Sequence, residues 1–279
     1  MLDKGFVDLH MHSNLSDGVL TPTGLVKKAA DLGLRCIALT DHDTVKGLAE
    51  AISAGSKYGV EIISGLEVST CFDGRSVHIL GYMVGTSGEA LKKLTLGNAT
   101  ARLERMRRMV GKINDLGYRV DINDLLEFAQ SVSVGRAHLA RYLVSLGYFK
   151  TIDGVFNQLL GDGKPAFEPV QRFSSQQAIR LIEECGGISS LAHPGNSFSK
   201  GEINTLVDAG LDAIEVFTPY HTSKMRKKLF KISQENGLIV TGGTDFHGYD
   251  RDINSLGAIR LPYWVVSGIK RRVSNRVMQ

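Results

Sequence analysis

Short apolar runs alternate with amphipathic helical segments along most of this 279-residue chain, and this alternation limits its fold more than any other feature. Helical patterns separate several of the runs: one opens at Pro22 and stops at Gly33, and another is capped by Ser174 and stops at Gly186. The expected strands are 6–9, 36–40, 60–64 continuing toward 68, 77–82, 188–192, 213–217, 238–241 and 258–261. Strands separated by helices predict a parallel sheet, and so many units favour an α/β barrel over an open sheet.

One region interrupts the alternation. Between residues 87 and 164 there is almost no strand signal, whereas helical patterns cover 89–116, 122–128, 137–146 and 152–160. We therefore predict a small helical domain, 87–164, inserted into the barrel and covering one face of it. The barrel itself is then discontinuous and consists of residues 1–86 and 165–279. Single α/β barrels of this total length are common.

The composition, with 43% hydrophobic and 22% charged residues, is that of a soluble globular protein with a sizeable core. The net charge of +4 suits an anionic substrate but is too small to indicate a stable nucleic-acid complex. No apolar run approaches the roughly 20 residues of a membrane span, the first residues lack the apolar segment of a secretion signal, and no CxxC pair is present. We expect a cytoplasmic protein without membrane contacts; its oligomeric state is not indicated.

Candidate metal ligands follow the expected strands. In "VDLHMHSNLSDG", His10 and His12 follow the first strand and Asp17 lies in the next turn. The others are His42 after "CIALT", Glu67 at the end of "VEIISGLEVS", His78 in "SVHILGY", His193 in "LAHPG", and Asp245 and His247 in "TDFHG". Because the carboxyl ends of parallel barrel strands meet at one mouth, we expect these side chains to lie together.

Taken singly, these residues have simpler explanations. His78 alone could be a hydrogen-bonded core or surface group, and Asp41 or Asp43 could cap the helix that "TVKGLAEA" predicts. Six histidines and three carboxylates on one face indicate a metal centre instead. Imidazole and carboxylate ligands suit Mn, Fe and Zn. Nine ligands are too many for one ion and about right for three if a carboxylate bridges, and Glu67 can give one oxygen to each of two ions.

The stretches "DLHMHSNLSDG", "ALTDHDT", "GLEVS", "HILGY", "AHPG" and "GTDFHG" resemble the motifs of the polymerase and histidinol phosphatase (PHP) superfamily. This resemblance implies a distorted, TIM-like (β/α)7 barrel with a trinuclear site, and an eighth strand near 258–261 outside the barrel. It assigns one ion to His10, His12, Glu67 and Asp245, a second to Glu67, His78 and His193, and a third to Asp17, His42 and His247. Mn is the preferred ion, with Fe or Zn as alternatives.

The "HSNLSDG" form and the helical insertion most resemble the stand-alone nucleotide phosphatases of this superfamily. The implied reaction is metal-assisted hydrolysis of the 3'-phosphate of a 3',5'-nucleoside bisphosphate such as pAp, giving AMP and phosphate. Glu67, Asp17 and His247 are the expected catalytic residues, and Asp17 and His247 also lie close to the substrate phosphate. Two alternatives stay open: a 5'-3' exonuclease acting on short 5'-phosphorylated RNA or DNA, and a metal-binding regulatory subunit without turnover.

Three arginines are candidate phosphate ligands. The helical stretch "ATARLERMRRMVGKI" has an apolar stripe from Leu103 to Ile113, with Arg102 beside it and Arg105 one turn onward. Both could place a guanidinium over the barrel mouth, although a solvated basic face is the alternative. Arg136 opens a later helix, where main-chain N–H groups also favour anions, and the resemblance supports its choice.

Three further residues received lesser roles. Glu215 and His221 are candidates for supporting the ligands from behind. His138 could assist Arg136 in binding phosphate, but we expect it on a helix surface.

Overall fold

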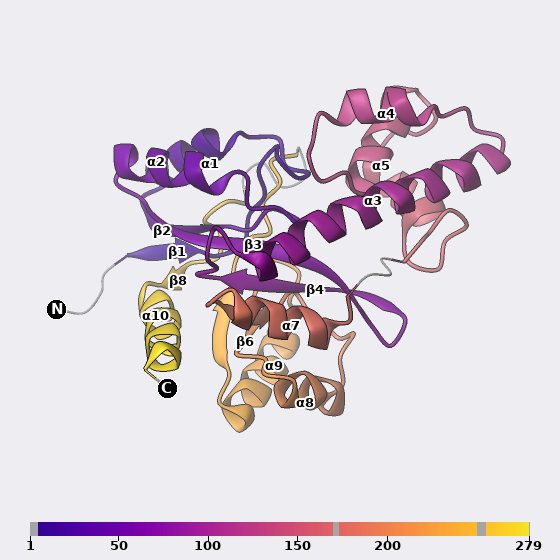
Figure 1. The fold of residues 1–279 in the computed structure, drawn as a ribbon. Helices are drawn as coiled ribbons and strands as arrows, with labels where there is room; N and C mark the ends of the chain where they lie inside the picture. The colour runs from indigo at the N-terminus through magenta and orange to yellow at the C-terminus, as the bar shows by residue number, and fades with distance from the viewer. Residues whose placement is uncertain (1–4, 170–172, 250–254, 279) are drawn as a thin grey trace.

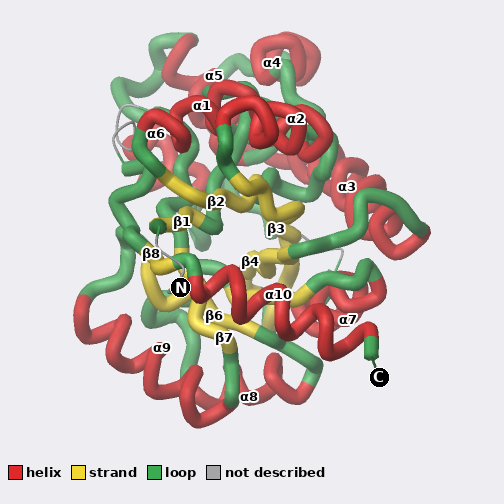
Figure 2. The backbone as a smooth tube through the Cα atoms, turned by 90° about the vertical axis from the view of Figure 1, so that its left-hand side faces the viewer, coloured by secondary structure: helices red, strands yellow, loops and turns green. Residues whose placement is uncertain are grey.

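The computed structural model describes residues 5–169, 173–249 and 255–278. Its strands form one sheet in the order β7-β6-β5-β4-β3-β2-β1-β8, which curves into a nearly closed barrel (Figures 1 and 2). The strands are β1 (Phe6–Asp8), β2 (Leu34–Leu39), β3 (Glu61–Phe72), β4 (Arg75–Tyr82), β5 (Ile188–Leu191), β6 (Ala213–Phe217), β7 (Ile239–Gly242) and β8 (Leu261–Pro262).

The residues just beyond β1 and β7 close the barrel. The main-chain N–H of Leu9 donates to the carbonyl of Gly242, and Met11 forms a parallel bridge with Phe246. β8 pairs antiparallel with β1 and lies outside this closure, with Phe6 opposite Pro262. The expected distorted barrel is therefore confirmed, with a final strand that is shorter and later than 258–261.

Besides β8, the prediction of a parallel sheet is also wrong at β4. This strand is antiparallel to both β3 and β5. Only Asp73 and Gly74 connect β3 to β4, and both have positive φ angles, of 48° and 77°. An Asp-Gly pair in this conformation makes a tight hairpin, whereas a parallel crossover needs a dozen residues or more. The two strands therefore form a long hairpin that extends past the barrel mouth.

Helices surround the strands, as Figure 2 shows. They are α1 (Pro22–Asp31), α2 (Leu48–Tyr58), α7 (Ser175–Glu184), α8 (Lys200–Asp208), α9 (Ser223–Asn236) and α10 (Trp264–Val277). Local chemistry sets their ends: the hydroxyl of Thr21 accepts from Gly24 at the start of α1, and Ser174 forms a capping box with Gln177 at the start of α7.

The segment between β4 and β5 is helical, as expected. It contains α3 (Glu89–Asp115), α4 (Ile122–Ala129), α5 (Arg136–Ser145), α6 (Ile152–Val155) and the π-helix η1 (Phe156–Leu160). Leu94 in the first half of α3 belongs to the apolar cluster of the barrel, whereas Met106 and Ile113 in its second half pack with α4 and α5 in a separate cluster. The long α3 thus connects the two parts (Figure 1). The division at residues 87 and 164 stays a prediction.

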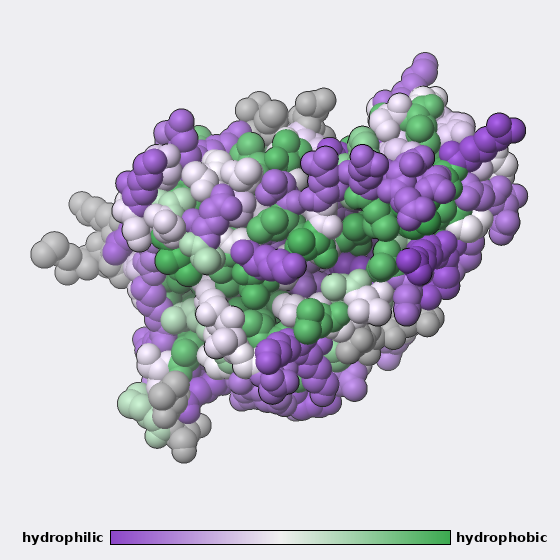
Figure 3. Space-filling view, turned by 45° about the horizontal axis from the view of Figure 1, so that its top comes forward, coloured by the Kyte–Doolittle hydropathy of each residue, from purple (hydrophilic) through white to green (hydrophobic). Residues whose placement is uncertain are grey.

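Hydrophilic side chains cover much of the insertion surface seen in Figure 3. Glu104, Arg107 and Arg108 of α3 are exposed. In the described ranges we find no helix with both the length and the apolar character needed to span a bilayer.

Candidate metal centre

The structure brings the nine predicted ligand side chains together at one end of the barrel. Seven of them lie in loops just beyond β1, β2, β5 and β7, whereas Glu67 and His78 lie within β3 and β4. The hairpin accounts for this difference, because its antiparallel pairing carries both residues to the mouth from inside their strands.

The first group centres on one edge of Glu67. The Nε2 atom of His12 lies 3.2 Å from Glu67 Oε2 and 3.2 Å from Asp245 Oδ1. His10 Nε2 lies 3.4 Å from the same two oxygens. These four side chains are close enough to share one ion, and they are the four that the resemblance assigns to the first ion.

The second group lies on the other oxygen of Glu67. The Oε1 atom is 2.9 Å from His78 Nδ1 and 3.1 Å from His193 Nε2. His42 approaches from the first side, with its Nδ1 3.0 Å from Glu67 Oε2. A compact metal-binding set here contains His42, Glu67 and His78, and His193 completes it through its contact with Oε1.

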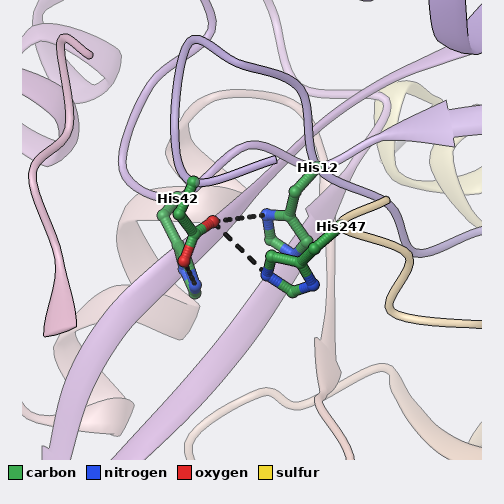
Figure 4. Close-up of side chains that lie close together, drawn as sticks. His12, His42 and His247 are labelled. Atoms are coloured by element: carbon green, nitrogen blue, oxygen red, sulfur yellow. Dashed lines mark ion pairs between the residues drawn. The ribbon is translucent and has the colours of Figure 1, made fainter. Parts of the chain in front are cut away.

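The third group surrounds Asp17. Figure 4 shows the rings of His12, His42 and His247 converging on one carboxylate. This is Asp17, whose oxygens lie 3.3 Å from His247 Nε2, 3.7 Å from His42 Nε2 and 3.8 Å from His12 Nδ1. Compared with the set that the resemblance implies, the geometry adds His12, whose ring stacks on His247 with centroids 4.3 Å apart.

Several of these buried ligand atoms make no hydrogen bond within the described part of the chain. They are His10 Nε2, His12 Nε2, Asp17 Oδ1, His42 Nδ1, Glu67 Oε2 and His78 Nδ1. Buried polar atoms normally have hydrogen-bond partners, so lone pairs that converge without a hydrogen-bond donor need a cation or another positive group as partner. A cluster of imidazole and carboxylate donors with this property fits divalent transition metals.

The electrostatics of the centre also favour cations. Burial would raise the pKa of Glu67, but the imidazoles of His42, His78 and His10 outweigh it and hold this pKa well below its usual range. Burial acts on Asp17 in the same direction, and His42 and His247 likewise keep its pKa well below the usual value. Both carboxylates are therefore charged and available as ligands at neutral pH.

Two aspartates that could have capped a helix support the ligand loops instead. α2 begins at Leu48, after Gly47, so neither Asp41 nor Asp43 caps it. The Asp41 carboxylate accepts from the Ser13 N–H and from the Ser13 and Ser16 hydroxyls, at 2.6 to 2.7 Å. These bonds fix the loop between His12 and Asp17.

The helical insertion supplies a second wall to the site. A cavity of about 160 Å³ is lined by Asp17, His42, Ser69, His78, Arg102, Arg105, Gly135, Arg136, Ala137, Phe156, His247 and Tyr249. Four predicted metal ligands thus face all three predicted phosphate-binding arginines across one space. An anion in this cavity would meet both.

The three arginines differ in how they are held. Arg102 is buried, with its Nε 2.5 Å from Asp43 Oδ2 and its Nη2 donating to the Ser69 hydroxyl at 2.6 Å. Arg105 is also buried and donates through Nε to the main-chain carbonyl of Glu168 at 2.6 Å. Neither forms the solvated basic face that was the alternative. Arg136 begins α5, as expected, and pairs with Asp162 at 2.7 Å.

Some features were predicted wrongly or missed. His138 lies in the interior rather than on a helix surface, and its Nδ1 accepts from the Gly135 N–H at 3.1 Å. The sequence pattern did not single out Ser69, Phe156 and Tyr249, which also line the cavity. Tyr249 lies two residues after His247 in "TDFHGY", and this proximity was the available signal. Ser69 likewise lies only two residues after the predicted ligand Glu67.

Comparisons with known proteins agree with this geometry. The PHP domain model matches residues 8–162. The chain is 34% identical to a 3',5'-nucleoside bisphosphate phosphatase of Chromobacterium violaceum, over 86% of this chain and 87% of that protein. It is 35% identical to a 5'-3' exoribonuclease of Haemophilus influenzae, over 86% and 89% of the two chains.

A crystal structure from Bifidobacterium adolescentis, assigned as a metal-dependent phosphoesterase, superposes with a TM-score of 0.89 at 28% identity and covers 98% of both chains. These matches agree with the barrel fold and with the cluster of candidate metal ligands at its mouth. The chain belongs to the PHP domain family and is a metal-dependent phosphoesterase.

Proposed function

We propose that this phosphoesterase removes the 3'-phosphate of 3',5'-nucleoside bisphosphates such as pAp, giving AMP and inorganic phosphate. The observation that carries the proposal is the cavity shared by the metal-ligand cluster and the three arginines. A bisphosphate has two phosphates, and the lining of the cavity offers two kinds of side chain for them. The ligand cluster suits the phosphate that reacts, and the arginines suit the one that stays.

Arg105 gives the clearest support for an anion. Among the residues that the structure describes, its buried Nη2 finds no hydrogen-bond acceptor. Burial, with the nearby charges of Arg136 and Arg102, lowers the pKa of Arg105 to about 9. Because a guanidinium keeps its proton at neutral pH, the lowered pKa means that its charge is poorly compensated. A phosphate dianion between the arginines would supply the missing acceptors and negative charge.

Arg136 is placed to contact the same phosphate. Its guanidinium lies over Phe156 and Phe167, with its central carbon 5.8 and 5.4 Å from the ring centroids. The side chain is 20% exposed, so it remains accessible from the cavity. The main-chain N–H groups at the start of α5 add partial positive charge there.

We further propose three divalent cations, with Mn preferred and Fe or Zn as alternatives, in the groups centred on Glu67 and Asp17. When bound, such ions lower the pKa of water and neutralise phosphate oxygens. Glu67 would bridge the first two groups through its two oxygens, 3.2 Å from His12 Nε2 and 2.9 Å from His78 Nδ1. Asp17 and His247 line the cavity itself, and we assign them to orienting the reacting phosphate.

A 5'-3' exonuclease is the second candidate, and one structural feature favours it. A further cavity of about 170 Å³ shares His78 and Arg136 with the first and is also lined by His193, Pro194 and Phe198. A nucleotide chain that passes the metal cluster could continue there. The Haemophilus relative is named for this activity. The small net charge of +4 favours the mononucleotide substrate, since long nucleic acids are normally bound by larger basic surfaces.

One assay with two substrates tests the proposal. The protein, loaded with Mn²⁺, is incubated with pAp and with a 5'-phosphorylated trinucleotide, and the products are identified by mass spectrometry. We expect AMP and phosphate from pAp, and slower turnover of the trinucleotide. Faster release of 5'-mononucleotides from the trinucleotide would establish the exonuclease instead. Metal-loaded protein that is inert toward both substrates would refute both candidates and support a regulatory subunit.

The cytoplasmic location stays a prediction.

A further inference from the structure

Glu215 is a buried carboxylate in an apolar strand. It lies in β6 between Ile214 and Val216, is completely inaccessible to solvent, and belongs to none of the three ligand groups. A buried charge of this kind is unfavourable unless several hydrogen bonds compensate it. Both of its oxygens contact predicted metal ligands, and the two ligands belong to different ions.

The first contact orients the ring of His10. Glu215 Oε1 lies 3.1 Å from His10 Nδ1. A carboxylate can only accept, so the proton of His10 is on Nδ1 and the Nε2 lone pair is free. That Nε2 points at Glu67 Oε2 and Asp245 Oδ1, the other oxygens of the first group. A carboxylate behind a histidine is a common way to fix a metal-binding tautomer.

The second contact holds the main chain of His193. Its N–H donates to Glu215 Oε2 at 2.7 Å, while its ring reaches Glu67 Oε1. His193 has a φ of 28°, in the left-handed region that residues other than glycine rarely adopt. The adjacent turn is anchored as well, because the Gly195 N–H donates to His221 Nε2. The position of His193 therefore depends on hydrogen bonds to Glu215 in β6 and to His221 just after this strand.

We propose that Glu215 is a positioning residue that couples two ion sites, through the side chain of His10 and through the main chain of His193. Changing it lowers the affinity of the first and second groups together and leaves the Asp17 group unchanged. This inference rests on the metal binding of the proposed function, and it is independent of which phosphoester is the substrate.

The variant Glu215→Gln tests this coupling while preserving side-chain size. An amide has one acceptor oxygen, and its NH₂ group can only donate, so it cannot accept from both His10 Nδ1 and His193 N–H. The measurements are Mn²⁺ titration calorimetry of chelator-treated protein and metal analysis of the reloaded protein. We expect binding at two of three ions to weaken about 10- to 100-fold, the usual effect of losing such a partner. The absorption spectrum of Co²⁺-loaded protein should change in parallel.

Asp212→Asn is the matched control. Asp212 immediately precedes the same strand, is also buried, and accepts from the main-chain N–H of Ser189 on β5 at 3.1 Å. Its other oxygen pairs with Arg276, and the residue lies outside all three ligand groups. We expect this variant to lose stability, measured as the melting temperature of the metal-free protein, with unchanged Mn²⁺ affinity.

Two results would overturn the inference: Mn²⁺ affinities in Glu215→Gln equal to those of the parent, or an equal loss of affinity in Asp212→Asn. Either can occur while the parent still hydrolyses pAp, so the proposed function would stand. Conversely, weakened metal binding in Glu215→Gln together with a parent inert toward nucleotides would support the inference and refute the function. A parent that binds no divalent metal would refute both.

Discussion

Arg102 and Asp43 form a buried ion pair that joins the helical insertion to the loop of the candidate ligand His42. The guanidinium comes from α3 and the carboxylate follows His42, with side chains 5% and 0% exposed. Asp43 Oδ1 also accepts from the main-chain N–H of Ser69, at 2.8 Å, and from the Asn98 amide. The pair therefore connects the barrel, the insertion and the cavity, and the placement of Arg102 in the site depends on it.

Breaking this pair should be strongly destabilising. Asp43→Ala leaves a buried guanidinium without its counter-charge, so we expect the free energy of unfolding to fall by about 3–5 kcal/mol. Urea denaturation measures it, and the double variant with Arg102→Ala should lose less than the sum of the single changes. Glu89→Ala, which removes the exposed Lys92–Glu89 pair, is the control and should leave stability unchanged. Strict additivity of the two single changes would contradict the role of the pair.

The same pair predicts a pH dependence of stability. Burial would raise the pKa of Asp43, but Arg102 and His42 outweigh it and lower the pKa below that of the unfolded chain. The contribution of this carboxylate is therefore complete above the unfolded pKa of about 3.9, and it is lost as pH falls toward the folded value. The difference in unfolding free energy between parent and Asp43→Asn should shrink as pH falls below about 4. A difference that is constant from pH 7 to pH 3 would exclude this linkage.

Loss of the bridging carboxylate should abolish turnover. Glu67→Gln weakens two ligand groups at once, so we expect phosphoesterase turnover to fall more than about 100-fold, beyond the effect of losing a supporting partner. Metal content should fall with it. Glu61→Gln is the control on the same strand, because Glu61 pairs with Lys270 away from the ligands. Normal metal content in Glu67→Gln would show that this residue is not a ligand.

Arg136→Ala should affect substrate binding more than chemistry. If the guanidinium contacts the phosphate that stays, its removal loses a charge-assisted bond, and KM for pAp should rise about 10- to 100-fold with a smaller change in kcat. Steady-state kinetics with p-nitrophenyl phosphate, which has no second phosphate, provide the control and should be unaffected. An equal rise in KM for both substrates would place Arg136 at the reacting phosphate instead.

The residue after β7 must be a glycine, Gly243, because the chain there passes close to the candidate ligand His10. A Cβ at this position would lie 2.4 Å from His10 N and 2.5 Å from His10 Cβ, so Gly243→Ala must displace the main chain that carries the ligand. We expect a loss of about 1–3 kcal/mol in stability and weaker Mn²⁺ binding. Gly111→Ala lies in α3, where a Cβ would meet no described atom within 4 Å outside the backbone of its own helix, and it should instead be neutral or stabilising. Unchanged metal affinity in Gly243→Ala would show that the ligand loop tolerates the shift.

The sequence by itself predicted the barrel and the nine side chains that gather at its mouth as candidate metal ligands. Apolar runs of strand length, helix caps such as Ser174 and strand-end histidines such as His10 are local signals, and parallel strand ends must meet at one mouth. The long helix of the insertion was also predictable, since its apolar stripe has the helical period. The tight Asp73-Gly74 turn was a local signal too, but its consequence for β4 was missed.

Only the tertiary structure decided which other polar groups meet around these candidate ligands. Arg102 pairs with Asp43, His138 is buried, and Glu215 contacts two candidate ligands. Each of these facts depends on residues that are distant in sequence, and no local pattern contains those distances. The same holds for the cavity, which forms where the insertion folds back over the barrel mouth. Periodicity and turn chemistry act between neighbours along the chain. Charge pairing and the satisfaction of buried polar groups act between neighbours in space.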